Sequence, residues 1–242
     1  MIAVGQFLFR FRNAIFPLVM LCALLFARPY YSFGSEAMDW LLDLVGIAMI
    51  VAGQGLRLLT IGYEYIRRGG RDGRVYAKGL VQGGVFAHCR NPLYVGNILL
   101  AVGFLVVIGQ WWLIAVGVPL VIFVYIAIVA AEEDYLSREF GDQYAAYQKR
   151  VNRWLPNWKG FRESVAPMDF NWQRVLAKEY NTVFAVLAGL LFIEAYTRSL
   201  EGGISQGGWA LVIAIGSLLA VGFLAIRLLK KKGVIRGWLP GE

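Results

Sequence analysis

The chain alternates between long apolar segments and polar connections. Six apolar segments stand out, and most are about as long as the ~17–25 residues that a helix needs to cross a bilayer. Hydrocarbon offers the backbone no hydrogen-bond partner, so each segment is predicted to be a helix. The pattern therefore predicts an all-α, multi-pass membrane protein. The segments cover residues 13–28, 38–61, 93–109, 111–131, 182–197 and 209–229.

Composition agrees with this reading of the pattern. Hydrophobic residues make up 58% of the chain and charged residues 17%, with a mean hydropathy of +0.56. An ordinary soluble protein has roughly 45–50% apolar and about 25% charged residues. A soluble globule and a disordered chain are thereby excluded. The net charge of +8 is explained by a membrane surface rather than by a nucleic acid, so we expect no nucleic-acid partner.

The distribution of basic residues predicts the sidedness. Twenty Lys and Arg residues lie in the N-terminal segment and in the connections 62–92, 132–181 and 230–242, against only Arg28 and Arg198 in the alternate connections. Cytoplasmic connections of membrane proteins carry the excess of Lys and Arg. We therefore expect both termini and both long connections to be cytosolic.

Two distant segments are predicted to converge on the cytosolic side. The third and fourth spans are joined by little more than residues 109–111, so they form a tight antiparallel hairpin with adjacent cytosolic ends. Apolar and aromatic residues in 132–152 recur at helical spacing, which predicts an amphipathic helix along the membrane surface. The segments 83–96 and 132–156 thus form one cytosolic mouth.

The segment HCRNPLYVG, residues 88–96, carries the first candidate chemistry. Pro92 suits the first turn of the third span, with Asn91 before it as a possible N-cap. The N-terminus of that helix, with Arg90 beside it, favours an anionic group such as a carboxylate. Tyr94 and Asn97 are three residues apart and are expected to share a helix face. The alternative is that this segment binds no ligand: it only caps the start of a membrane span and carries an arginine on the cytoplasmic side.

Glu132 and Glu133 form the second candidate group, directly after an apolar span. Acidic residues at the end of a helix oppose its macrodipole and are expensive near hydrocarbon. We expect Arg90, Arg57 or a cationic ligand to compensate them. Arg57 itself, near one end of the second span, is expected to snorkel to the interface.

Taken together, these segments resemble a known superfamily. The order RNPxYxG, a helical hairpin, EExxLxxxFGxxYxxYxxxV and a following Arg-Trp-Leu-Pro resembles the isoprenylcysteine carboxyl methyltransferase and phospholipid methyltransferase superfamily of integral membrane enzymes. The resemblance covers about residues 45 to 156. Its first element is matched by Gly84, Phe86, Arg90, Asn91, Pro92, Tyr94 and Gly96, and its second by Glu132, Glu133, Leu136, Phe140, Gly141, Tyr144, Tyr147 and Val151.

The resemblance implies that S-adenosylmethionine binds at the cytosolic mouth without a Rossmann domain and without a metal. Arg90, Glu133 and Arg150 are the expected catalytic residues, and Tyr147, Arg150 and Arg153 are the expected acceptor contacts. The acceptor is expected to be a membrane lipid or a lipid-like molecule that enters from the bilayer. The expected cofactor-binding residues are Gly84, His88, Arg90, Asn91, Pro92, Tyr94, Gly96, Glu132 and Glu133.

The chain also departs from the superfamily pattern. Asn91 stands where histidine is common, which removes an imidazole base at that position. His88 is the only histidine, and it either compensates or is merely solvated. Arg150 either orients an acidic or phosphate-bearing acceptor or contacts lipid headgroups.

Three regions follow from this interpretation. Residues 1–44 hold the first span and the start of the second, 45–158 form the methyltransferase core, and 159–242 are a connector with two further spans. These last two spans are expected to wall the lipid entrance or to form a homodimer contact. The absence of an ER retrieval tail favours a bacterial cytoplasmic membrane.

Two other function classes stay open. Membrane sterol reductases resemble the same core, and the basic cluster Arg67, Arg68, Arg71 and Arg74 offers a site for the phosphates of NADPH. A non-enzymatic membrane protein or transporter is the second alternative, although a paired broken-helix repeat is absent. Among acceptors, the sequence does not choose between an isoprenylcysteine carboxylate, a phospholipid amine and a small thiol.

Overall fold

The computed structural model describes residues 1–12, 35–64 and 79–235, and these residues form helices and connections without a strand. Residues 2–12 are helical. The remaining elements are α2 (Glu36–Tyr63), the 3-10 helix η2 (Gly84–Ala87), α3 (Pro92–Ile108), α4 (Trp111–Arg150), α5 (Phe161–Val165), α6 (Trp172–Glu201) and α7 (Gln206–Lys231).

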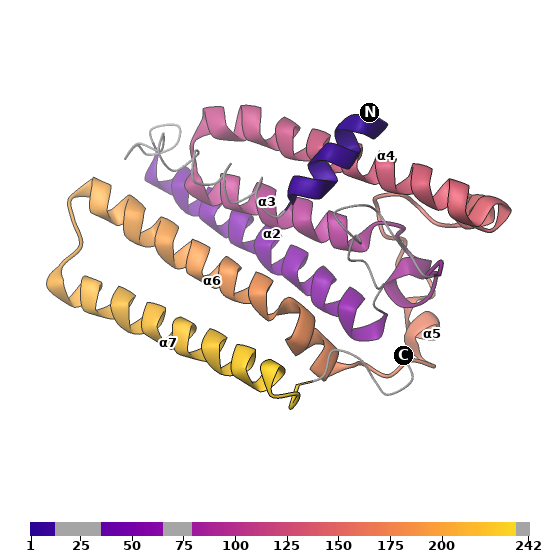
Figure 1. The fold of residues 1–242 in the computed structure, drawn as a ribbon. Helices are drawn as coiled ribbons and strands as arrows, with labels where there is room; N and C mark the ends of the chain where they lie inside the picture. The colour runs from indigo at the N-terminus through magenta and orange to yellow at the C-terminus, as the bar shows by residue number, and fades with distance from the viewer. Residues whose placement is uncertain (13–34, 65–78, 236–242) are drawn as a thin grey trace.

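The long helices run up and down beside one another (Figure 1). Four of them, α2, α4, α6 and α7, are long and apolar enough to cross a membrane, and α3 is a shorter apolar helix of 17 residues. They match the five predicted spans from residue 38 onward, so the all-helical, multi-pass prediction is confirmed for the described residues. The predicted first span, 13–28, lies outside them.

The closest packing in the bundle is between α2 and α3, and it depends on two facing pairs of glycines. A Cβ on Gly103 would lie 2.7 Å from the Gly46 carbonyl oxygen, and a Cβ on Gly53 would lie 2.7 Å from the Gly96 carbonyl oxygen. The pairs are seven residues apart on each helix, which is two turns. Small residues let membrane helices approach backbone to backbone.

Helix α4 differs from the prediction in its second half. The helical span continues past residue 131 as far as Gly141, so Glu132 and Glu133 lie in the interior of its first part and not at a helix end. The chain changes direction at Gly141, whose φ of 46° and ψ of −122° interrupt the helical conformation. After it, Tyr144, Tyr147 and Val151 pack back against Leu136. The helix that follows the span therefore begins after Gly141 and not at residue 132 as predicted.

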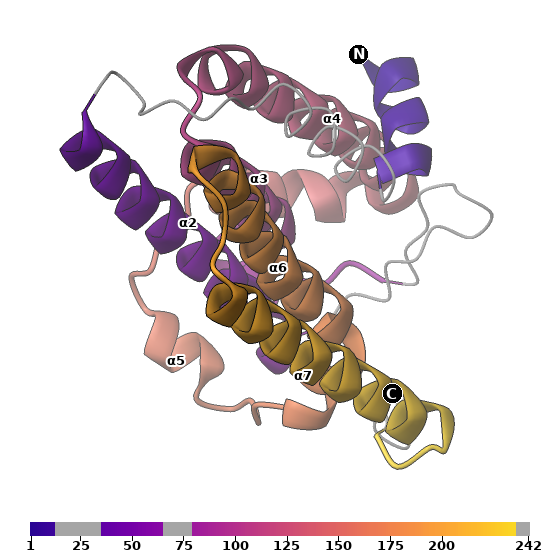
Figure 2. The ribbon, with the colours of Figure 1, turned by 90° about the vertical axis from the view of Figure 1, so that its left-hand side faces the viewer.

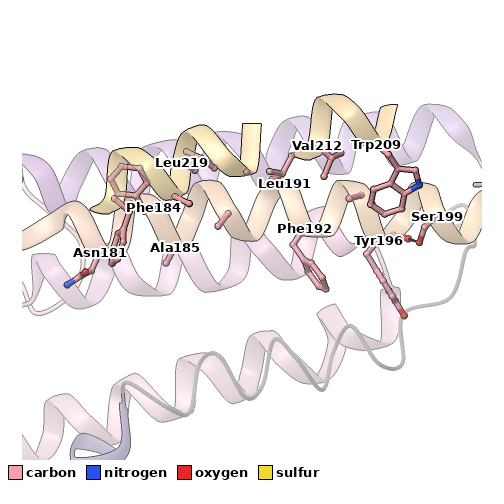
Figure 3. Close-up of a pocket in the computed structure, with 15 residues that line it drawn as sticks. Asn181, Phe184, Ala185, Leu191, Phe192, Tyr196, Ser199, Trp209, Val212 and Leu219 are labelled. Atoms are coloured by element: carbon pink, nitrogen blue, oxygen red, sulfur yellow. Dashed lines mark hydrogen bonds between the residues drawn. The ribbon is translucent and has the colours of Figure 1, made fainter. Parts of the chain in front are cut away.

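Helix α6 lies between α7 and the pair formed by α2 and α3 (Figure 2). Among the described helices, α7 packs chiefly on α6, and none of its residues is buried. A mostly apolar groove of about 750 Å³ runs between α6 and α7. Figure 3 shows it extending from Asn181 to Ser199, with Phe184, Leu191 and Trp209 along its length.

The glycine pairs predict the outcome of a substitution. Gly103→Val places a side chain against the backbone of α2, and overpacking of this kind costs about 1–3 kcal/mol. We expect a lower midpoint of thermal unfolding in detergent. Gly55→Ala on α2 is the matched control, because a Cβ there has nothing within 4 Å, and it should leave the midpoint unchanged or slightly higher. Equal midpoints for Gly103→Val and wild type would contradict the packing argument.

Candidate active site

Three segments meet at the end of the bundle where α3 begins: residues 88–91, the interior of α4, and the chain after α4. The Arg90 amide donates to the Asn152 carbonyl oxygen at 2.9 Å, and the Asn157 amide donates to the His88 carbonyl oxygen at 3.0 Å. These backbone hydrogen bonds fix residues 152–157 beside the start of α3. The predicted convergence of the two motif segments is thus observed.

The reversal at Gly141 is what makes the meeting possible. A straight helix from Glu133 to Arg150 would carry the chain about 25 Å away, at ~1.5 Å per residue. Instead, the last turns of α4 return, and the Tyr147 hydroxyl donates to the Phe86 carbonyl oxygen at 2.7 Å. Tyr147 therefore ties α4 to η2, directly before the motif at the start of α3.

Glu133 is the centre of the site. One carboxylate oxygen lies 2.6 Å from an Arg153 guanidinium nitrogen, and the other lies 3.3 Å from Arg90. Arg90 also donates to the Gln148 carbonyl oxygen at 3.1 Å. The side chains of Glu133 and Arg90 are 9% and 12% exposed, so these charges interact largely away from water. Arg90 was among the expected partners of the acidic pair, whereas Arg153 was expected to contact the acceptor.

This cluster keeps hydrogen-bonding capacity that the protein does not use. Arg90 Nε, Arg153 Nε and Glu133 Oε1 are buried and have no hydrogen-bond partner. Buried polar groups normally find partners, because leaving one unsatisfied costs about 1–3 kcal/mol. Two guanidinium donors and a carboxylate acceptor fit a ligand that carries both a carboxylate and an amino group.

Two further buried groups lie beside Glu133. Glu132 precedes it on α4 and is 3% exposed, and Tyr144 is 1% exposed. Burial, and after it the neighbouring Glu133 carboxylate, raises the pKa of Tyr144 above its ordinary value. The phenol therefore stays protonated at neutral pH and offers a hydroxyl to the site. Sequence reasoning used Tyr144 only as a motif match and missed this placement.

The start of α3 follows the prediction with one difference. Pro92 begins the helix and Asn91 occupies the N-cap position, but the Asn91 side chain makes no capping hydrogen bond. It donates instead to the Arg153 carbonyl oxygen at 3.2 Å. The predicted side-chain cap is therefore wrong, and Asn91 helps to hold Arg153 in the cluster.

His88 and Cys89 both join the start of α3 to the chain after α4. The His88 ring nitrogens lie 2.5 Å from the Asn157 carbonyl oxygen and 2.9 Å from the Ser164 hydroxyl oxygen. The Cys89 thiol is buried and donates to the Trp154 carbonyl oxygen at 3.3 Å. Burial raises the pKa of Cys89 to about 11, so this thiol is neutral at physiological pH and is a poor nucleophile.

The other expected residues divide into two groups. Gly84, Pro92, Tyr94 and Gly96 are buried near the start of α3, and Gly84 has a φ of 52°. Arg150, in contrast, is exposed and donates to Gln82 at 2.8 Å, so it does not join the Glu133 cluster. Arg67, Arg68, Arg71 and Arg74, the cluster considered for NADPH, lie outside the described residues.

Sequence reasoning missed a second buried polar network, formed by α2, α3 and α6. Arg57 pairs with Glu179 at 2.6 Å and donates to the Asn97 side-chain oxygen. Of the partners expected for the acidic pair on α4, Arg57 is not one, because it pairs with Glu179 of α6. Glu179 stands outside every motif and before the predicted span 182–197, so no sequence signal marked it.

One comparison with known proteins finds a similar family. The model of the phospholipid methyltransferase family matches residues 42–143. Searches of curated proteins and of solved structures give no significant match. The matched range begins in α2 and ends just after the Gly141 reversal, so it includes Arg90, Glu132 and Glu133. Over these residues the chain is similar to the phospholipid methyltransferase family, whose members are integral membrane enzymes that methylate phospholipid-type acceptors with S-adenosylmethionine.

Proposed function

We propose that the protein methylates the amine headgroup of a membrane phospholipid at the Glu133 cluster. The observation that supports this site is the Arg90, Glu133 and Arg153 arrangement with its unused buried donors and acceptor. It lies at the start of α3, within or beside the range that matches the family. Among the open acceptors, the family match favours the phospholipid amine over an isoprenylcysteine carboxylate or a small thiol.

The same residues fit the amino-acid end of S-adenosylmethionine. We assign the cofactor carboxylate to Arg90 and Arg153, and its amino group to Glu133, because these pairings match charge to charge. The sulfonium of the bound cofactor supplies an electrophilic methyl group. The protein's contribution is to orient the reactants and to exclude water from them.

An amine acceptor must lose a proton before its nitrogen lone pair can attack. The side chain of Asn91 is an amide and already donates to the Arg153 carbonyl oxygen, so it is no base. Glu133 pairs with two arginines, and its Oε1 is assigned to the cofactor amino group. We therefore propose that the carboxylate of Glu132, which is 3% exposed, accepts the proton from the amine. A carboxylate at this position also attracts the cationic headgroup.

The site is proposed to face the cytosol, and the acceptor to enter from the bilayer between helices. The support is the positive-inside excess of Lys and Arg at the end of the bundle that holds the site. The groove between α6 and α7 (Figure 3) is mostly apolar, which suits either a lipid-facing wall or a contact between two copies.

Calorimetric titration with S-adenosylhomocysteine tests the cofactor site. We expect Glu133→Gln and Arg153→Gln each to weaken binding about tenfold or more, since breaking a buried charge pair costs about 2–5 kcal/mol. Arg138→Gln is the matched control, because Arg138 is an exposed residue of α4 that pairs with Asp134, and it should bind like wild type. NADPH binding without S-adenosylhomocysteine binding would move the protein to the reductase alternative.

The acceptor is tested with vesicles that contain phosphatidylethanolamine and radiolabelled S-adenosylmethionine. We expect radiolabel in the lipid fraction with the wild-type protein and its loss with Glu132→Gln. The affinity of Glu132→Gln for S-adenosylhomocysteine should stay within about threefold of wild type, because a proton acceptor acts in the chemical step more than in binding. Label in a prenylated cysteine peptide or a small thiol, and none in the lipid, would overturn the amine assignment.

The reversal of α4 has its own test. Gly141 has a φ of 46° and an open surrounding, so Gly141→Ala adds backbone strain of about 1–3 kcal/mol without a clash. We expect weaker S-adenosylhomocysteine binding, because Arg153 no longer returns to Glu133. Ser137→Ala, at an exposed position of the same helix, is the control. Unchanged affinity in Gly141→Ala would show that the reversal does not depend on this glycine.

A further inference from the structure

The polar network around Arg57 lies deeper in the bundle than the Glu133 cluster. Arg57 Nε donates to one oxygen of Glu179 at 2.9 Å and Nη2 donates to the other at 2.6 Å. Thr182 accepts from Arg57 at 3.4 Å, and Gln54 donates to Glu179 at 3.2 Å. The side chains of Arg57 and Glu179 are 13% and 3% exposed. This is a bidentate, largely buried ion pair between α2 and α6.

The network also reaches the helix that begins at the active site. Arg57 donates to the side chain of Asn97 on α3, and Tyr125 on α4 is hydrogen-bonded to Asn97. Asn97 lies one turn beyond Tyr94, which packs against Tyr125 with ring centroids 5.8 Å apart. One continuous set of contacts therefore joins Glu179 to the first turns of α3.

Gly96 makes room for this arrangement. A Cβ at Gly96 would lie 2.6 Å from Arg57 Cγ, so the aliphatic part of Arg57 occupies the space that the glycine leaves. Gly96 is the last residue of the RNPxYxG motif. Because it has no side chain, it allows both the close approach of α2 and the packing of Arg57 against α3. The guanidinium must then be neutralised within the bundle, because an unpaired charge near hydrocarbon is expensive.

We propose that Glu179 is a positioning residue for methyl transfer: it fixes Arg57, which holds Asn97 and thereby the acceptor-facing side of α3. Helix α6, which lies outside the range matched by the family, would then complete the active site. The proposal rests on the proposed function. It places the effect on the acceptor, because the cofactor contacts at Arg90, Glu133 and Arg153 are held independently by α4 and the chain after it.

The first test compares Glu179→Gln with wild type in methyl transfer to phosphatidylethanolamine vesicles. We expect kcat/KM for the lipid to fall about tenfold to hundredfold, as small misplacements of reacting groups do. The dissociation constant for S-adenosylhomocysteine should stay within about threefold of wild type, because its charge contacts are intact. An equal loss of cofactor affinity and lipid turnover, or no loss of either, would overturn the proposal.

A double variant separates positioning from stability. Arg57→Met with Glu179→Leu replaces the pair by apolar side chains, which is often neutral or stabilising for a buried ion pair. We expect a thermal midpoint at or above that of wild type together with the low lipid turnover of Glu179→Gln. Asn97→Ala should show the same low turnover with the ion pair present. Wild-type turnover in the stable double variant would assign the pair a structural role only.

Glu194→Gln is the control on the same helix, since Glu194 forms an exposed pair with Arg198. It should match wild type in turnover and cofactor affinity. Wild-type protein that binds S-adenosylhomocysteine but labels no lipid contradicts the acceptor assignment under the proposed function. A labelled lipid in wild type with unaltered turnover in Glu179→Gln contradicts only the role of Glu179.

Discussion

The backbone-to-backbone approach of α2 and α3 is the constraint on which the rest of the structure depends. Gly46 faces Gly103 and Gly53 faces Gly96, and at each contact a single Cβ would collide with a carbonyl oxygen of the other helix. Apolar side chains alone do not select one arrangement of helices in lipid, because hydrocarbon tails are equally apolar. The glycines supply that selectivity, and the start of α3 is placed beside α2 as a result.

Two features form the candidate site: a cluster of opposite charges and one change of chain direction. Glu133 forms ion pairs with Arg90, from the segment before α3, and with Arg153, from the chain after α4. The reversal at Gly141 places Arg153 close enough to pair with Glu133. Each of these three residues also has a buried polar atom without a hydrogen-bond partner. Such atoms either bind a ligand or remain desolvated at a cost in stability. The family match supports ligand binding.

Much of this arrangement could be predicted from the sequence, for identifiable reasons. Apolar runs of span length predict membrane helices because the backbone has no other way to satisfy its hydrogen bonds, and α2, α3, α6 and α7 follow that rule. The pairing of Arg90 with Glu133 was among the expected compensations. The reversal at Gly141 was not predicted, because the spacing of apolar residues is helical on both sides of it. Glu179 was missed because its partner lies 122 positions away and no local pattern marks it.

That separation has a consequence for biosynthesis. Helix α2 leaves the ribosome long before α6, and 122 residues take about 6–24 s to add at ~5–20 residues per second. During this interval Arg57 is in an apolar helix without its counterion. Because an unpaired charge is expensive in hydrocarbon, we expect Arg57 to stay in the headgroup layer until Glu179 has been synthesised. Once α6 has been added, pairing with Glu179 neutralises Arg57 within the bundle.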